Sequence, residues 1–207
     1  MAPAQASTSL RTGSPRQRRS RRAYWWASRS RDGRGYANDN PRDASWLYPS
    51  IQEISRVLKD DSFFVCFYGW HTVDQFLSTW RKAGFWTLEQ LVWEKEYPSS
   101  TGIVSRYHEA AYVLAKGKPP RPELILKSVL EWQYTGNTLH PSQKPLLAIL
   151  LLILAYSRKG DIVLDPFVGS GTTAVAAHLA GRRYIGIELD PVYARIAEER
   201  LKESGRE

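Results

Sequence analysis

Hydrophobic positions from residue 46 onward follow helical and strand-like spacings in turn. One apolar stripe has members three or four residues apart, at Leu47, Ile51, Ile54 and Leu58. This spacing predicts one face of a helix. The unbroken apolar run 62–68 has the length of a strand and indicates one that is covered on both faces. A second helical stripe begins at Val73 and is expected to end at Gly84.

The rest of the chain continues this alternation. Further strands are expected at 88–93, 111–115, 161–165 and 184–189, and further helices at 145–156, 172–180 and 191–202. Segments 97–106 and 117–139 are irregular, with many Pro, Ser, Gly and aromatic residues. Strands that alternate with helices favour an α/β fold with a mostly parallel sheet and helices on both faces.

The first residues differ from everything that follows. Residues 1–23 contain only Met1 and Leu10 as apolar side chains larger than alanine, so we expect a disordered arm. The chain has a net charge of +8, but eight of its 29 basic residues lie in 1–31, where there is no acid. The remainder carries 21 basic and 21 acidic residues. The high pI therefore does not indicate a basic groove in the folded body. This weakens the hypothesis that the protein binds nucleic acid through charge alone.

Composition also excludes several kinds of protein. The single cysteine, Cys66, rules out a disulfide framework, and the four histidines lack the spacing of metal ligands. The longest apolar run, 146–156, is too short to span a bilayer, so no membrane is expected and we predict a cytoplasmic protein. The Arg- and Ser-rich arm overlaps in composition with organelle transit peptides, and this alternative stays open.

The sharpest local signal is a glycine loop, Asp165-Pro166-Phe167-Val168-Gly169-Ser170-Gly171-Thr172-Thr173. It follows an expected strand and opens an expected helix, where unpaired N–H groups can face a ligand. Glu188 ends the next strand, in position to accept hydrogen bonds from ribose hydroxyls. Thr172 stands where a Walker loop needs lysine. A dinucleotide-binding loop, with its acid 17 residues beyond Gly171, and a loop without a ligand remain as alternatives.

Two motifs together resemble one known family. Asp-Pro-Phe-x-Gly-Ser-Gly-Thr is similar to the S-adenosylmethionine loop of the DNA amino-methyltransferases, which methylate adenine N6 or cytosine N4. The segment 140–145, His-Pro-Ser-Gln-Lys-Pro, resembles that family's companion motif, His-Pro-Thr-Gln-Lys-Pro. The companion motif precedes the glycine loop, as in a permuted subgroup. The resemblance implies a circularly permuted, Rossmann-like methyltransferase sheet.

The resemblance also implies a set of site residues. Those expected to line the pocket of the methyl donor are Asp165, Pro166, Phe167, Gly169, Gly171 and Thr172. Glu188 would hold the ribose. The residues expected to close over the methionine end are His140, Lys144 and Pro145.

The catalytic motif of such enzymes is Asp-Pro-Pro-Tyr at the end of a strand. Its acceptors localise the lone pair of the target amine, and its aromatic ring stacks on the flipped base. Here Tyr24 falls on the tyrosine, but Arg21-Arg22-Ala23 replaces Asp-Pro-Pro. We therefore expect the N-terminal strands to be missing and the arm 1–23 to derive from a frameshift, a misassigned start or gene decay. A genuine, divergent arm is the alternative.

These observations predict one methyltransferase domain over 24–207, with target-recognition loops at 97–107 and 117–139. The expected activity is site-specific transfer of a methyl group from S-adenosylmethionine to adenine N6 in double-stranded DNA, impaired in this chain. A cognate restriction nuclease is an expected partner, and the oligomeric state is left open. Alternatives are a cytosine-N4 methyltransferase, a non-catalytic remnant that binds the cofactor or DNA, and an RNA or small-molecule methyltransferase.

Overall fold

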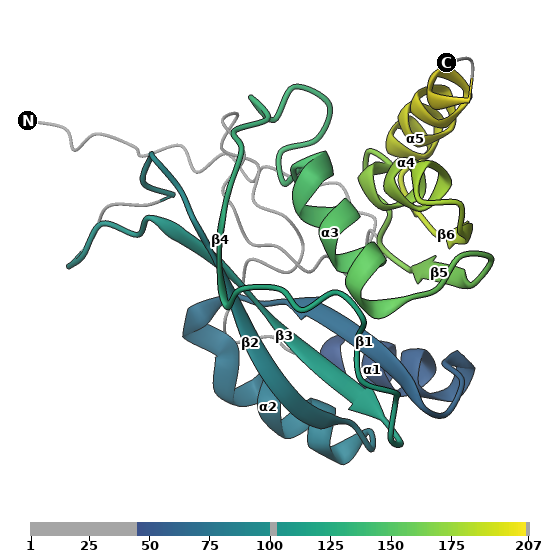
Figure 1. Ribbon diagram of the computed structural model, residues 1–207. Coiled ribbons are helices and arrows are strands. Elements are labelled where there is room, and N and C mark those ends of the chain that lie inside the picture. Colours follow the sequence, from purple (N-terminus) through teal and green to yellow (C-terminus); the bar gives the residue numbers. More distant parts are fainter. Residues whose placement is uncertain (1–44, 100–102, 206–207) are drawn as a thin grey trace, which may run out of the picture.

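The computed structural model describes residues 45–99 and 103–205 (Figure 1). Tyr24 and the arm 1–23 lie outside these residues. The elements, in chain order, are α1 (Leu47–Val57), β1 (Ser62–Phe67), the 3-10 helix η1 (Trp70–Thr72), α2 (Val73–Lys82), β2 (Trp86–Glu94), β3 (His108–Lys116), β4 (Val129–Glu131), α3 (Leu146–Tyr156), β5 (Ile162–Asp165), α4 (Thr172–Leu179), β6 (Arg183–Gly186) and α5 (Pro191–Ser204).

The strands form two hydrogen-bonded groups. Four strands pair in the order β1-β3-β2-β4, and β5 pairs with β6 separately. The expected parallel pairing holds for β5 with β6 and for β2 with β4, whereas β3 runs antiparallel to both of its neighbours. Parallel pairing of β3 with β2 would need a crossover connection between the two strands, usually a helix. The described residues contain no helix between β2 and β3.

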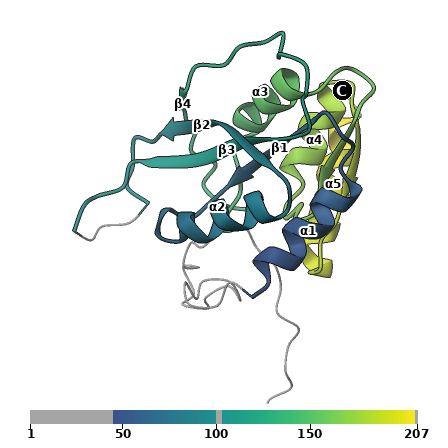
Figure 2. The ribbon, with the colours of Figure 1, turned by 90° about the horizontal axis from the view of Figure 1, so that it is seen from below.

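Helices cover both faces of the larger sheet, as the sequence predicts (Figures 1 and 2). Successive residues of β3 point to opposite faces. Ala111 and Val113 pack in a core with α3 and α4, whereas Ala110 and Leu114 pack in a second core with α1 and α2. A strand that is buried on both faces has no polar side to alternate with, which explains its continuous apolar run.

The helix boundaries agree with the predicted ones to within about two residues. The most apolar helix, α3, has 11 residues and is buried because it packs between the sheet and α4. Among the described residues, no helix has the length and apolar character that crossing a membrane requires. Strand β4 was not predicted from the sequence, because three residues are too few to show a period.

Strand β6 differs from the other strands in its exposure. It ends at Gly186, three residues earlier than predicted, and all four of its residues are exposed. Ile185 and Ile187 each keep 51% of their surface in solvent, and Leu189 keeps 63%. Within the described part of the chain, β6 pairs with β5 along one edge and with no strand along the other. An apolar sheet edge therefore faces outward.

The two-core arrangement predicts that replacing two tryptophans by alanine changes the stability of the protein by very different amounts. Trp80 of α2 is completely buried, whereas Trp86 of β2 is 71% exposed. We expect Trp80→Ala to lower the free energy of unfolding by about 3–5 kcal/mol, because it removes a large buried side chain. Trp86→Ala should change it by less than about 1 kcal/mol. Urea denaturation of both variants measures this, and equal losses would contradict the assignment of the second core.

Candidate functional site

The loop between β5 and α4 needs glycine at two positions. Gly169 and Gly171 have φ values of 53° and 84°, in the left-handed region that other residues adopt at a cost. At Gly171 space is also limiting, because a Cβ there would lie 2.8 Å from the Cα of Ala197 in α5. The loop is therefore held close against α5.

Helix α5 also fixes the loop through a side chain that sequence reasoning did not single out. One terminal nitrogen of Arg200 donates to the Ser170 carbonyl oxygen at 2.6 Å and to Thr172 Oγ1 at 3.2 Å. The helix begins at an N-cap, Asp190, whose Oδ1 accepts from the Val192 N–H at 3.0 Å. This bond gives a partner to one of the main-chain N–H groups at the start of the helix.

Two carboxylates meet the loop through main-chain N–H groups. Glu188 Oε2 accepts from the Gly169 N–H at 3.0 Å, and its Oε1 accepts from the Asp190 N–H at 2.9 Å. Asp165 Oδ1 accepts from the Phe167 N–H at 3.0 Å, and burial raises the pKa of the Asp165 carboxyl. Each oxygen of Glu188 retains a lone pair for a further donor. Glu188, the residue predicted to hold the ribose, thus lies directly beside the glycine loop.

The 140–145 segment lies against the same loop. A Cβ at Gly169 would be 3.5 Å from the His140 ring, so the two motifs are in contact. His140 Nδ1 accepts from the Ser142 N–H at 3.1 Å, and its ring packs edge-on against Tyr193 at 4.3 Å between centroids. Burial, assisted by Lys144, lowers the pKa of His140 to about 4. The imidazole is therefore neutral at physiological pH.

Lys144 connects this segment to the larger sheet. Its ammonium lies 5.1 Å from the ring centre of Phe67, the last residue of β1, and 5.9 Å from that of Trp132. It donates to the Ser142 carbonyl oxygen at 3.3 Å, and its own carbonyl oxygen accepts from Thr172 Oγ1 at 3.3 Å. Desolvation lowers the pKa of Lys144 to about 8.

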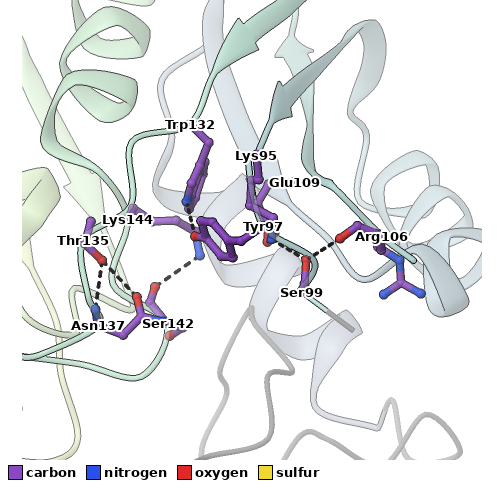
Figure 3. Close-up of polar contacts among 10 residues, drawn as sticks. All are labelled: Lys95, Tyr97, Ser99, Arg106, Glu109, Trp132, Thr135, Asn137, Ser142 and Lys144. Carbon is purple, nitrogen blue, oxygen red and sulfur yellow. Dashed lines mark hydrogen bonds and ion pairs between the residues drawn. The ribbon is translucent and has the colours of Figure 1, made fainter. Parts of the chain in front are cut away.

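Beyond Lys144 lies a polar network that sequence reasoning missed (Figure 3). Lys95 and Glu109 form a buried ion pair of 2.5 Å, and Trp132 Nε1 donates to the Tyr97 hydroxyl at 3.1 Å. Burial raises the pKa of Glu109, while Lys144 and Lys95 oppose that shift. Trp132, in the segment 117–139, is packed in the core. No local motif marks Lys95 or Glu109, because they meet only through the register of β2 with β3.

A cavity of about 330 Å³ lies between these elements. The predicted site residues that line it are His140, Lys144, Asp165, Pro166, Phe167, Gly169 and Thr172. Three others contribute differently. Gly171 and Glu188 shape the loop from outside the cavity wall, and Pro145 is fully buried at the start of α3. The predicted catalytic Tyr24 lies outside the described residues.

Comparison with known proteins gives a consistent result. Residues 26–199 match the model of a family described as DNA methylase. The chain is 47% identical over 178 residues to YubD of Escherichia coli K12, described as a methylase, covering 86% of this chain and 78% of that protein. It is 52% identical over 78 residues to the type II methyltransferase M2.DpnII of Streptococcus pneumoniae, covering 38% and 28%. The crystal structure of the M1.HpyAVI–SAM complex superposes with a TM-score of 0.66 at 27% identity, covering 76% and 82%.

The loop geometry predicts that two glycine-to-alanine substitutions lower the stability of the protein by different amounts. Gly160 and Gly171 have φ values of +87° and +84°, but a Cβ at Gly160 meets nothing within 4 Å. We expect Gly160→Ala to cost about 1 kcal/mol of stability, for left-handed backbone alone. Gly171→Ala should cost about 1–3 kcal/mol more, because α5 must move. Thermal unfolding of both variants measures the difference, and equal costs would show that the loop and α5 are not tightly packed.

Proposed function

This chain belongs to the DNA methylase family, and on that premise we propose that its cofactor is S-adenosylmethionine and its substrate is double-stranded DNA. The methyl group goes to an exocyclic amine, adenine N6, at a specific site. Cytosine N4 is the alternative target, because both amines require the same chemistry. A cognate restriction nuclease stays a predicted partner.

The observation that carries this proposal is the contact between the glycine loop and Glu188. The Gly169 N–H to Glu188 bond of 3.0 Å places a carboxylate with spare lone pairs beside a loop that has no room for a side chain at Gly171. Adenosine hydroxyls are donors that fit such a carboxylate. The adjoining cavity supplies an aromatic wall at Phe167 and polar groups at His140 and Asp165. The residues present therefore fit a nucleoside with a polar tail.

The charges of the site suit a cationic donor. When bound, S-adenosylmethionine supplies a methyl group on a positively charged sulfonium. His140 stays neutral because its pKa is lowered to about 4, so it adds no repulsion. Burial raises the pKa of the Asp165 carboxyl, and the positive charge of Lys144 opposes that shift. In this arrangement the chain's own residues would bind and orient the donor.

The proposed DNA-contacting surface includes the loop between β2 and β3. Arg106 lies 4.7 Å from the ring centre of Trp70, and Trp70 is 57% exposed. A guanidinium stacked on an exposed indole offers a cation for a phosphate and a face for a base. This pair favours the predicted recognition role of segment 97–107.

Cofactor binding tests the proposal directly. We expect Glu188→Ala to weaken S-adenosylmethionine binding by about 1.5–3 kcal/mol, because the charge-assisted bonds to the ribose are lost. The matched control is Glu198→Ala, an exposed glutamate on α5, which should bind as the wild type does. Isothermal titration calorimetry measures all three proteins. Equal affinities, or tighter binding of NAD, would overturn the cofactor assignment.

Methyl transfer to DNA is a separate prediction. As the sequence stands, Arg21-Arg22-Ala23 precede Tyr24, and arginine offers only donors where the reacting amine needs acceptors. We expect little or no transfer, with a loss of about 10²–10³ in rate for each missing contact. The chain then acts as a non-catalytic remnant, which is the second candidate function.

Replacing residues 1–23 with the strand, helix and Asp-Pro-Pro of a family member should restore transfer to adenine in duplex DNA. Incorporation of tritiated methyl groups is the measurement, and Tyr24→Ala in the restored protein is the control. Robust methylation by the unmodified chain would refute the interpretation of its N-terminal sequence.

A further inference from the structure

Lys95 holds the stem of the hairpin that joins β2 to β3. The Lys95 N–H donates to the Tyr107 carbonyl oxygen at 2.8 Å, and the Ser99 N–H donates to the Arg106 carbonyl oxygen at 2.8 Å. The ammonium of Lys95 also donates to Ser99 Oγ. Because Lys95 contacts the stem through its main chain and its side chain, the position of its ammonium fixes the shape of the stem. The hairpin stem consists of residues 95–99 and 106–107.

Lys144 holds the 140–145 segment in a comparable way. Its carbonyl oxygen accepts from Thr172 Oγ1 of the glycine loop at 3.3 Å, and its ammonium donates to the Ser142 carbonyl oxygen at 3.3 Å. The Ser142 N–H in turn donates to His140 Nδ1 at 3.1 Å. The side chain of Lys144 therefore helps to set how this segment lies on the glycine loop.

Glu109, the second residue of β3, interacts with both lysines. Its side chain is buried and pairs with the Lys95 ammonium at 2.5 Å. Burial raises the pKa of Glu109, and the charges of Lys144 and Lys95 oppose that shift. Burial lowers the pKa of Lys144 to about 8, and the charge of Glu109 opposes that change. One carboxylate thus attracts two ammonium groups that belong to segments far apart in the sequence.

Two aromatic side chains form a second connection between the same lysines (Figure 3). The Lys144 ammonium lies 5.9 Å from the ring centre of Trp132, and Trp132 Nε1 donates to the Tyr97 hydroxyl at 3.1 Å. The Lys95 ammonium lies 5.2 Å from the ring centre of Tyr97. Contacts therefore run without a break from the hairpin stem to the glycine loop, and Glu109 is the anion at their centre.

We propose that Glu109 is a positioning residue that couples the hairpin stem to the 140–145 segment, so that a ligand that orders one of them also orders the other. Glu109 itself contacts neither DNA nor cofactor. Without its charge, the Lys95 and Lys144 ammonium groups repel each other and lose the attraction that offsets their burial. The stem and the segment then open independently. The ligands assigned to the two parts, DNA and S-adenosylmethionine, rest on the proposed function.

Hydrogen exchange on the full chain without any ligand tests the coupling first. We expect Glu109→Gln to speed exchange of the Ser99 and Ser142 amides at least fivefold, because the stem and the segment both loosen. The Val192 amide, bonded to Asp190 at the start of α5, should be unchanged and so exclude a general loss of stability. Faster exchange at Ser99 alone would show that the segment does not depend on Glu109, and would overturn the proposal.

The matched control is Glu94→Gln. Glu94 precedes Lys95 in the chain, but its side chain is exposed. This variant removes a carboxylate from the same part of the sheet without removing the countercharge of the two lysines. Its Ser99 and Ser142 amides should exchange within about twofold of the wild-type rates. An effect as large as that of Glu109→Gln would mean that the overall charge of this region, and not Glu109, controls both segments.

A second measurement adds S-adenosylmethionine. In the wild type, the cofactor should slow exchange at Ser99 at least threefold although it binds at the glycine loop, because coupling between sites is reciprocal. In Glu109→Gln the cofactor should change that rate by less than about twofold. Binding without any response of Ser99 in the wild type would overturn the coupling. No cofactor binding at all would instead refute the proposed function, and the exchange rates without ligand would still decide the role of Glu109.

A double variant separates the charge of Glu109 from its packing. Lys95→Met combined with Glu109→Leu replaces the buried pair by apolar side chains, a change that often leaves stability equal or higher. We expect its thermal unfolding to match that of the wild type or exceed it, and the response of Ser99 to S-adenosylmethionine to be lost. A response of wild-type size in this variant would show that packing alone transmits the effect, and would overturn the proposal.

Discussion

The close approach of Gly171 to α5 is the constraint on which the rest of the site depends. With no side chain at that position, the loop after β5 rests on Ala197, and Arg200 from the same helix holds the Ser170 carbonyl oxygen. This contact fixes where α4 begins and where the Gly169 N–H points. Glu188 accepts from that N–H, so the end of β6 is placed by the same loop. Gly171 is thus a packing residue that positions the loop.

Charged side chains form a second group of contacts, on the side of the site where β2 and β3 meet the 140–145 segment. Lys95 and Glu109 are almost completely buried as a pair, and Lys144 lies close enough to influence Glu109. Removing charges from water is costly, and pairing offsets part of that cost. The pair joins the end of β2 to the start of β3, and Lys144 links both to the 140–145 segment. The charge of Lys144 therefore acts together with the packing of His140 against Tyr193 to hold that segment.

The sequence predicts the parts of this fold that depend on near neighbours in the chain. The stripe of α1, the apolar run of β1 and the glycine loop each carry their signal within a few residues. It does not predict the Lys95–Glu109 pair, because the two residues meet only once Trp93 is in register with Glu109. Arg200 is missed for a similar reason: its partners lie about 30 residues earlier. The direction of β3 depends on a connection whose shape no residue pattern specifies.

The outward edge of β6 bears on how molecules of this protein associate with one another. Ile185 is exposed on β6, Ile187 and Leu189 are exposed just after it, and within the described residues β6 pairs with a strand on one side only. An uncovered edge of this kind is a template for the same edge of another molecule. Pairing through such an edge becomes more favourable as the concentration rises, even when each molecule is correctly folded. The strand that would carry this association takes no part in either core.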